Sequence, residues 1–113
     1  MGTIEPMRGL SADALLRRPV RLRGVRLGET VDLILDPEGT RVLGFDVLCG
    51  DDVHRFLPFP AAELAGGGVA VASTLTLLDE DQRAFYRRHG RSFVAEDGLR
   101  DAQVTATGDL LAA

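Results

Sequence analysis

The segment from residue 31 to residue 57 constrains the fold of this chain more than any other stretch. It holds three strand-like runs of apolar residues, separated by Pro-Glu-Gly at 37–39 and Gly-Asp at 50–51. Both separators suit β-hairpin turns, because proline fixes φ early in a turn and glycine readily takes the left-handed conformation. The segment therefore predicts a three-stranded antiparallel meander.

The first turn also predicts the register of the first hairpin. A three-residue loop at 37–39 pairs Leu33 with Leu43 and gathers apolar residues on one face of the sheet: Val31, Leu33, Leu35, Leu43, Phe45, Val47 and Cys49. A slip of one residue would move Asp32 and Asp36 onto this face, which disfavours the alternative register.

The second turn predicts the pairs of the second hairpin. A two-residue loop at 50–51 sets Phe45 opposite Phe56 on the apolar face and Asp46 opposite Arg55 on the outer face. The outer face also carries apolar residues, so we expect it to be covered: Ile34, Val42, Leu48, Val53 and Leu57. A sheet that is partly apolar on both faces favours a closed or strongly coiled small barrel over an open sheet.

Length and composition indicate an ordinary globular protein. The 113 residues suit a single domain. The sequence lacks the run of about eighteen apolar residues that a transmembrane helix needs, and its first residues lack the apolar core of a signal peptide. A single cysteine, Cys49, excludes an internal disulfide and fits a reducing compartment. We therefore predict a cytoplasmic protein.

The pattern of turns and periodic runs divides the chain into four regions. We expect a flexible tail at 1–10, a mainly β domain at 11–76, a docking helix at 77–90 and a C-terminal strand or hairpin segment at 91–113. Within the domain, Ser11 is expected to cap a short helix over 12–18. Residues 19–27 are expected to form a hairpin around Gly24.

The stretch 77–89 predicts the one long α-helix. Asp79 is placed to cap its N-terminus, with Gln82 at the spacing of a capping box. Acidic residues fill the first turn and basic residues the last, as the helix dipole favours. Phe85 and Tyr86 give the helix a narrow apolar stripe with which it can dock on a surface.

All thirteen basic residues are arginine, and two groups of them stand out. Residues 17–26 hold five arginines, and three more recur at every fourth position from Arg83. A solvated strand face and ion pairs along the helix are the simpler interpretations. The alternative is an anion-binding or partner-binding surface, because guanidinium groups suit phosphates; it involves Arg17, Arg18, Arg21, Arg23, Arg83, Arg87 and Arg91. The net charge of −4 disfavours a dedicated duplex-DNA binder.

The C-terminal segment 98–113 echoes the central hairpin. In both places an aspartate precedes a glycine by seven residues, at Asp32 and Gly39 and again at Asp101 and Gly108. Either the similarity is a coincidence or the segment is a truncated second repeat. A lone hairpin is marginal in water, so it should dock beside the predicted helix or pair with a second chain in a two-fold dimer. We expect the homodimer, with contacts from Phe85, Tyr86, Leu99, Val104, Leu110 and Leu111.

The side chains capable of chemistry do not form a catalytic or metal-binding pattern. His54 is expected to be half-buried on the apolar face, and His89 ends the helix among arginines, so neither has the neighbours of a transition-metal site. Cys49 falls on the apolar face, where a thiol behaves as a small hydrophobe. Asp32 and Asp46 fall on the outer face, where we expect paired surface charges rather than an acid–base dyad. The sequence therefore predicts a protein that is not an enzyme and that needs no metal or cofactor.

Four short segments follow one another in a characteristic order: Leu-Leu-Arg-Arg-Pro-Val-Arg-Leu-Arg-Gly at 15–24, Leu-Gly-Glu-Thr-Val-Asp at 27–32, Asp-Pro-Glu-Gly at 36–39 and Phe-Leu-Pro at 56–58. On these segments, residues 15–73 resemble the PRC-barrel family, which is named after the photosynthetic reaction centre H subunit and includes the C-terminal domain of a ribosome-maturation factor. The resemblance implies a small, mostly antiparallel barrel, whose members act by docking to proteins, to a ribosomal assembly or to a membrane complex.

The resemblance and the residues lead to one expectation about function. The N-terminal transmembrane helix of the reaction-centre subunit and the N-terminal barrel of the maturation factor have no counterpart in this sequence, so neither full role is expected. We expect a non-enzymatic protein-interaction or assembly module with a mainly β, PRC-barrel-like fold, one C-terminal helix and a short tail. An RNA-associated ribosome-assembly accessory factor and a small-ligand-binding barrel are the alternatives.

Overall fold

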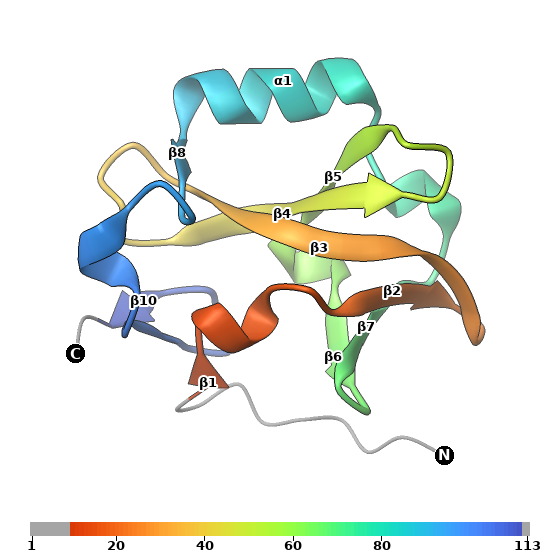
Figure 1. Cartoon of the computed structure of the whole chain (residues 1–113), viewed down its shortest axis with the longest axis horizontal. Helices are drawn as coiled ribbons and strands as arrows, with labels where there is room; N and C mark the ends of the chain where they lie inside the picture. The colour runs from red at the N-terminus through yellow and green to blue at the C-terminus, as the bar shows by residue number, and fades with distance from the viewer. Residues whose placement is uncertain (1–9, 112–113) are drawn as a thin grey trace.

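The computed structural model describes residues 10–111 as a mainly β protein with one α-helix (Figure 1). The main sheet has the strand order β5-β4-β3-β2-β7-β6. A further short strand, β8, pairs with β3 outside this linear order. The strands of this sheet are β2 Pro19–Leu22, β3 Val25–Leu35, β4 Val42–Cys49, β5 His54–Pro58, β6 Glu63–Ala65, β7 Gly68–Ala70 and β8 Arg91–Ser92. Within the described residues, β5 and β6 at the two ends of this order do not pair, so the sheet does not close into the expected barrel.

A second, smaller sheet brings together the two ends of the described chain. β1 (Leu10–Ser11) and β10 (Leu110–Leu111) each pair antiparallel with the central strand β9 (Gln103–Val104). Short 3₁₀ helices connect other elements: η1 Asp13–Leu15, η2 Phe59–Ala61, η3 Thr74–Thr76 and η4 Asp97–Leu99. Apart from Leu10, the predicted flexible tail lies outside the described residues.

The predicted meander is present as β3-β4-β5, but the register of its first hairpin differs from the expected one. Leu33 pairs with Phe45 instead of Leu43, because Leu35 already pairs with Val42 instead of Arg41 and the ladder then shifts once more between Leu35 and Ile34. The pairing skips Val31 on one strand and Leu43 on the other, and both are only half-buried. Gly39 takes the left-handed conformation as predicted, with φ 71°. The connection is one residue longer than the predicted three-residue loop, because Leu35 pairs with Val42 and the Asp36 N–H donates to the Arg41 carbonyl.

The register of the second hairpin also differs from the predicted one, because the loop between its strands is longer than expected. Residues 50–53 link β4 to β5, where a two-residue loop was predicted. Asp52 takes the left-handed conformation of this loop, with φ 65°. Phe45 therefore pairs with Leu57 and Asp46 with Phe56, so the predicted pairs of Phe45 with Phe56 and of Asp46 with Arg55 are both wrong.

The hydrophobic core lies against the sheet face that carries Phe45, Val47 and Cys49, as predicted, but Val42 and Leu57, which were predicted on the other face, also belong to it. Phe45 and Val47 are fully buried there, and Phe45 stacks on Phe59 with ring centroids 6.0 Å apart. Cys49 is 7% exposed within the same core, as predicted. The small sheet adds the fully buried Val104 to this core.

Helix α1 (Glu80–His89) lies across the other face of the main sheet (Figure 1). The Asp79 carboxylate caps its N-terminus by accepting a 3.0 Å hydrogen bond from the Gln82 N–H, as predicted. The helix has no buried residue, so it rests on the sheet without entering the core. Across residues 10–111, no helix is both long enough and apolar enough to span a membrane.

The helix predicted over 12–18 is wrong, because a single 3₁₀ turn at Asp13–Leu15 takes its place. Arg17 has a left-handed backbone, with φ 61°, and its N–H donates to the Thr30 carbonyl on β3 at 2.6 Å. The chain therefore leaves the helical conformation here and runs alongside β3. The hairpin predicted around Gly24 is present as β2 and the first part of β3.

The C-terminal hairpin docks on its own chain, next to β1 and the loop between β3 and β4, and away from α1 (Figure 1). The Val42 N–H donates to the Gly108 carbonyl at 2.7 Å, and the Leu110 N–H donates to the Thr40 carbonyl at 2.8 Å. The segment thus contacts the same turn that its sequence echoes.

Candidate functional site

Two aspartates face each other beneath α1. Asp32 on β3 and Asp46 on β4 are cross-strand partners, with 4% and 1% of their surfaces exposed. The prediction that they are surface charges is wrong, because α1 covers this face of the sheet. Two carboxylates in this arrangement repel each other, so both require nearby cations.

Helix α1 supplies those cations from Arg83 and Arg87, which share its inner face at i,i+4 spacing. Arg83 donates hydrogen bonds from Nε and Nη2 to Asp46 Oδ2, at 3.2 and 2.9 Å. Arg87 Nη1 lies 3.2 Å from Asp32 Oδ2 and 3.3 Å from Asp46 Oδ2. Arg87 therefore bridges the two acids.

Polar groups from other elements complete this arrangement. His54 Nδ1 lies 2.9 Å from Asp46 Oδ1, and Asp32 accepts hydrogen bonds from the Ser92 hydroxyl and from two backbone N–H groups. The prediction that His54 points to the apolar face is wrong, since the shifted register turns it toward the helix. We call the following side chains the carboxylate cluster: Asp32, Asp46, His54, Arg83, Arg87 and Ser92.

The carboxylate cluster fixes the helix on the sheet. Among the side chains that the structure describes, no buried nitrogen or oxygen lacks a hydrogen-bond partner, and a buried carboxylate that loses its cation strongly destabilises a fold. Arg83 and Arg87 are therefore committed to Asp32 and Asp46 and do not form the free phosphate-binding face that their spacing suggested. Arg91 is also paired, with Glu96 at 3.0 Å.

The arginines near the N-terminus divide between structural and exposed positions. Arg18 is 9% exposed, and its Nε donates to the Ala14 carbonyl at 2.8 Å. Arg17, Arg21 and Arg23 are exposed, and the last two line an open hollow of about 380 Å³ near the β2-β3 turn. The fold thus brings two of the predicted arginines together at this surface, on a different part of the sheet from those of α1.

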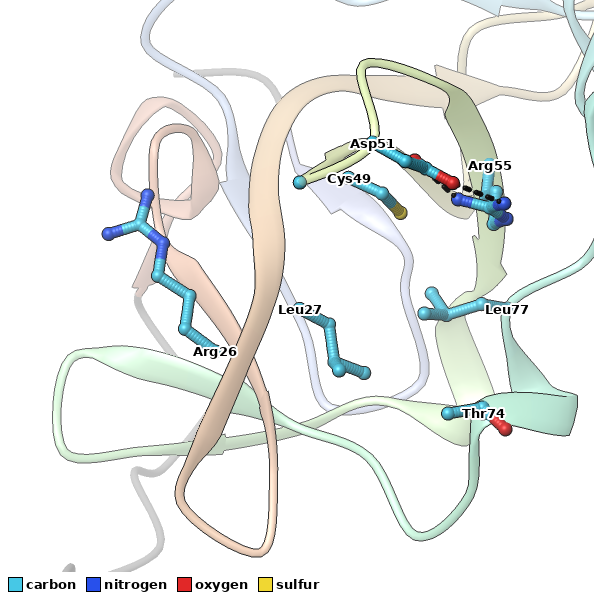
Figure 2. A pocket seen from close by; sticks show the side chains of 8 residues that line it. Arg26, Leu27, Cys49, Asp51, Arg55, Thr74 and Leu77 are labelled. Carbon is cyan, nitrogen blue, oxygen red and sulfur yellow. Dashed lines mark hydrogen bonds and ion pairs between the residues drawn. The ribbon is translucent and has the colours of Figure 1, made fainter.

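Another hollow, of about 400 Å³, opens beside the connection between β4 and β5 (Figure 2). Leu27, Cys49 and Leu77 line it, and Asp51 and Arg55 lie at its rim. The Arg55 guanidinium donates two hydrogen bonds to the Asp51 carboxylate, at 3.0 and 2.9 Å. The volume falls in the range of small-molecule sites, and the residues provide apolar walls with one ion pair at the edge.

The Asp51–Arg55 pair supplies two of the three charged residues that line this hollow, and Arg26 is the third. Hydrogen bonds from Arg55 hold the pKa of the Asp51 carboxyl at about 2. The pKa of Arg55 is raised above its ordinary value, first by Asp51 and then by the Cys49 thiol. Arg55 therefore places a cation close to the Cys49 thiol. The charges of Asp51 and Arg55 offset each other, which leaves Arg26 as the remaining charged residue of the lining.

The outer face of α1 carries an exposed aromatic ring. Phe85 is 50% exposed, and its ring contacts Tyr86 edge-on at 5.5 Å and His89 at 4.6 Å between centroids. Tyr86 itself turns inward and stacks on Phe56, with centroids 4.1 Å apart. Of the two aromatic residues predicted as dimer contacts, Phe85 is available to a partner and Tyr86 is engaged within its own chain.

The other predicted dimer contacts belong to the C-terminal segment. Leu99 and Leu110 are partly buried against the core, and Leu111 is 54% exposed. Val104 is fully buried in its own chain, so it is not available to a second chain in this arrangement.

The exposed Phe85 ring lines an open hollow of about 520 Å³ on the surface of the helix. We call its lining the α1 outer face: Asp81, Gln82, Ala84, Phe85 and Arg88. Acidic, small, aromatic and basic side chains thus lie together on one side of a short helix.

The carboxylate cluster was missed from the sequence although its members left a signal. Asp32 and Asp46 interrupt apolar strands on a face that was itself expected to be covered. A buried acid needs a cation, and Arg83 and Arg87 have the spacing to supply two from one helix face. The two aspartates and the two arginines can be matched only when it is known that α1 covers this face of the sheet.

No model of a known protein family matches this chain, and a search of curated proteins found no match. The function is therefore inferred from the geometry of the chain itself and from the sequence resemblance.

Proposed function

We propose that this protein is a non-enzymatic interaction module of the PRC-barrel type, and that it docks a protein partner on the α1 outer face. The proposal is carried by the half-exposed ring of Phe85, on a helix whose Tyr86, Arg83 and Arg87 all face inward. Aromatic residues are enriched at protein interfaces, and they supply much of the binding energy there.

The carboxylate cluster supports this proposal because it holds the docking helix in place. A ten-residue helix is marginal by itself, and α1 has no buried residue to anchor it. Ion pairs of 2.9 to 3.3 Å from Arg83 and Arg87 attach it to β3 and β4. A surface that is fixed before binding loses less conformational entropy when the partner arrives.

Support for the PRC-barrel type comes from the ordered sequence segments in 15–73 and from the mainly β architecture. In that architecture β2, β3, β4 and β5 follow one another as antiparallel neighbours. The resemblance implies a docking function, which agrees with an exposed aromatic ring on a rigidly held helix.

Photo-crosslinking in the cells of origin tests the proposed docking. The photoreactive residue p-benzoylphenylalanine replaces Phe85, and in a matched control it replaces Val25, which is 64% exposed on β3. We expect an adduct of one defined mass from position 85 that position 25 does not give. No adduct at position 85, or the same adducts at both positions, would count against docking on the α1 outer face.

A further inference from the structure

Four residues of the α1 outer face have the spacing of a helix–helix packing site. Asp81, Ala84, Phe85 and Arg88 stand at positions i, i+3, i+4 and i+7, which together form a hole for a side chain of a facing helix. The same four residues line the hollow of about 520 Å³. The shape of this surface therefore suits a helix as its partner.

The charges of this face suit one helix in particular. Asp81 lies three residues before Ala84, and Arg88 lies three residues after Phe85, so the two charges are symmetric about the middle of the helix. An antiparallel copy of the same helix reverses this order and sets Asp81 against the partner's Arg88. Both residues are exposed, and within residues 10–111 neither forms an ion pair in its own chain.

We propose that the partner of the α1 outer face is a second copy of this chain, joined through antiparallel α1 helices about a two-fold axis. The axis passes at the level of Ala84 and Phe85, so Phe85 lies against the partner's Phe85, and the small Ala84 side chain lets the helices approach closely. The two-fold symmetry forms the Asp81–Arg88 pair twice. This inference rests on the proposed docking function and specifies its partner.

The proposed contact is small, so the dimer is weak. A helix of ten residues is about 15 Å long, and a contact centred on it buries less than the roughly 1,200 Å² of stable interfaces. Exposed ion pairs add modestly to this. The chain is therefore monomeric when dilute and dimeric when concentrated.

Two charge-reversed variants, Asp81→Arg and Arg88→Asp, test the antiparallel geometry by sedimentation velocity over a range of protein concentrations. In either variant alone, a dimer sets like charges against each other twice, and the dissociation constant rises at least about tenfold. An equimolar mixture places two arginines on one helix opposite two aspartates on the other. Association therefore returns in the mixture.

Two further variants make the test independent of the charge changes. Phe85→Ala removes the central contact and raises the dissociation constant at least about tenfold. Glu63→Arg reverses an exposed charge on β6 and leaves association unchanged. Circular dichroism of each variant establishes that α1 is still folded.

A wild-type chain that stays monomeric at every concentration overturns the inference. So does a mixture of the two charge-reversed variants that stays monomeric while both keep their helix. If either variant loses its helix, Phe85→Ala decides: association equal to wild type overturns the inference. The docking function fails separately, since a crosslink from position 85 to a protein of another mass retains docking and rejects self-association.

Discussion

Asp32 and Asp46 lie directly opposite each other on β3 and β4, and one guanidinium, that of Arg87, lies within 3.3 Å of both carboxylates. Two acids placed side by side in a sheet repel each other. The helix therefore acts as their counter-ion as well as their cover, and its attachment to the sheet is electrostatic as much as apolar. Four predictions, each with its own substitutions, test this structure.

Asp46→Asn should destabilise the fold strongly. The substitution removes the charge that Arg83 and Arg87 neutralise and leaves their guanidinium groups partly buried without it. We expect the free energy of unfolding to fall by about 3 kcal/mol, measured by urea denaturation. The control Glu96→Gln breaks an exposed pair with Arg91 and should cost less than about 1 kcal/mol. Equal effects of the two substitutions would mean that the carboxylate cluster does not hold α1.

Removing the aromatic ring beneath α1 should destabilise the fold far more than removing the ring on its outer face. Phe56→Ala deletes a ring that is 1% exposed and stacked on Tyr86, so it should lower the free energy of unfolding by about 3–5 kcal/mol. Phe85→Ala deletes an exposed ring and should change it by less than about 0.5 kcal/mol. Both are compared by urea denaturation of dilute protein. A loss from Phe85→Ala as large as that from Phe56→Ala would show that the Phe85 ring is buried within its own chain and not exposed on the α1 outer face.

Gly44→Ala should destabilise the meander, because β4 and β5 approach closely at this residue. An added Cβ would lie 2.4 Å from the Leu57 carbonyl oxygen and 2.5 Å from Phe56 Cζ. We expect a loss of about 1–3 kcal/mol in thermal or urea denaturation. Gly98→Ala is the matched control, since its Cβ would meet no atom within 4 Å. Tolerance of Gly44→Ala would indicate that β4 and β5 pair in a different register.

Arg55→Gln should raise the pKa of Asp51 from about 2 toward the ordinary aspartate value near 4. The folded pKa is depressed, so this pair contributes to stability above about pH 4 and loses its contribution as the pH falls toward 2. The ¹³C carboxyl shift of Asp51, followed from pH 1.5 to 6, measures the change. The control Arg26→Gln should leave the titration as it is in wild type. An Asp51 pKa near 4 in the wild type would mean that the fork with Arg55 does not persist in solution.

The strands of the meander could be predicted because their signals are local. Apolar alternation and the turn around Gly39 lie within a few residues of the structure that they specify, and so does the capping of α1 by Asp79. The pairing partners could not be predicted, because they depend on the skipped residues Val31 and Leu43 and on the left-handed Asp52. None of these three residues is a glycine, the residue that usually marks an irregular backbone position.

The carboxylate cluster could not be predicted for a different reason. Asp32 and Asp46 are placed opposite each other by the shifted register, and Arg83, which bonds Asp46, lies on a helix 37 residues further along the sequence. The sequence carries both halves of this arrangement, but the physical link between them is the docking of α1 on the sheet. Phe85, in contrast, was identified from the helix pattern itself.

The outward direction of Phe85 is tested most directly by solvent paramagnetic relaxation in NMR, with a soluble gadolinium chelate and selectively labelled phenylalanine rings. In dilute protein the Phe85 ring protons should relax strongly, and the Phe56 ring protons should be almost unaffected. The effect on Phe85 should decrease as the protein is concentrated and a second copy covers the α1 outer face. Weak relaxation of Phe85 in dilute protein, or strong relaxation of Phe56, would contradict the orientation of α1 on which the proposed function depends.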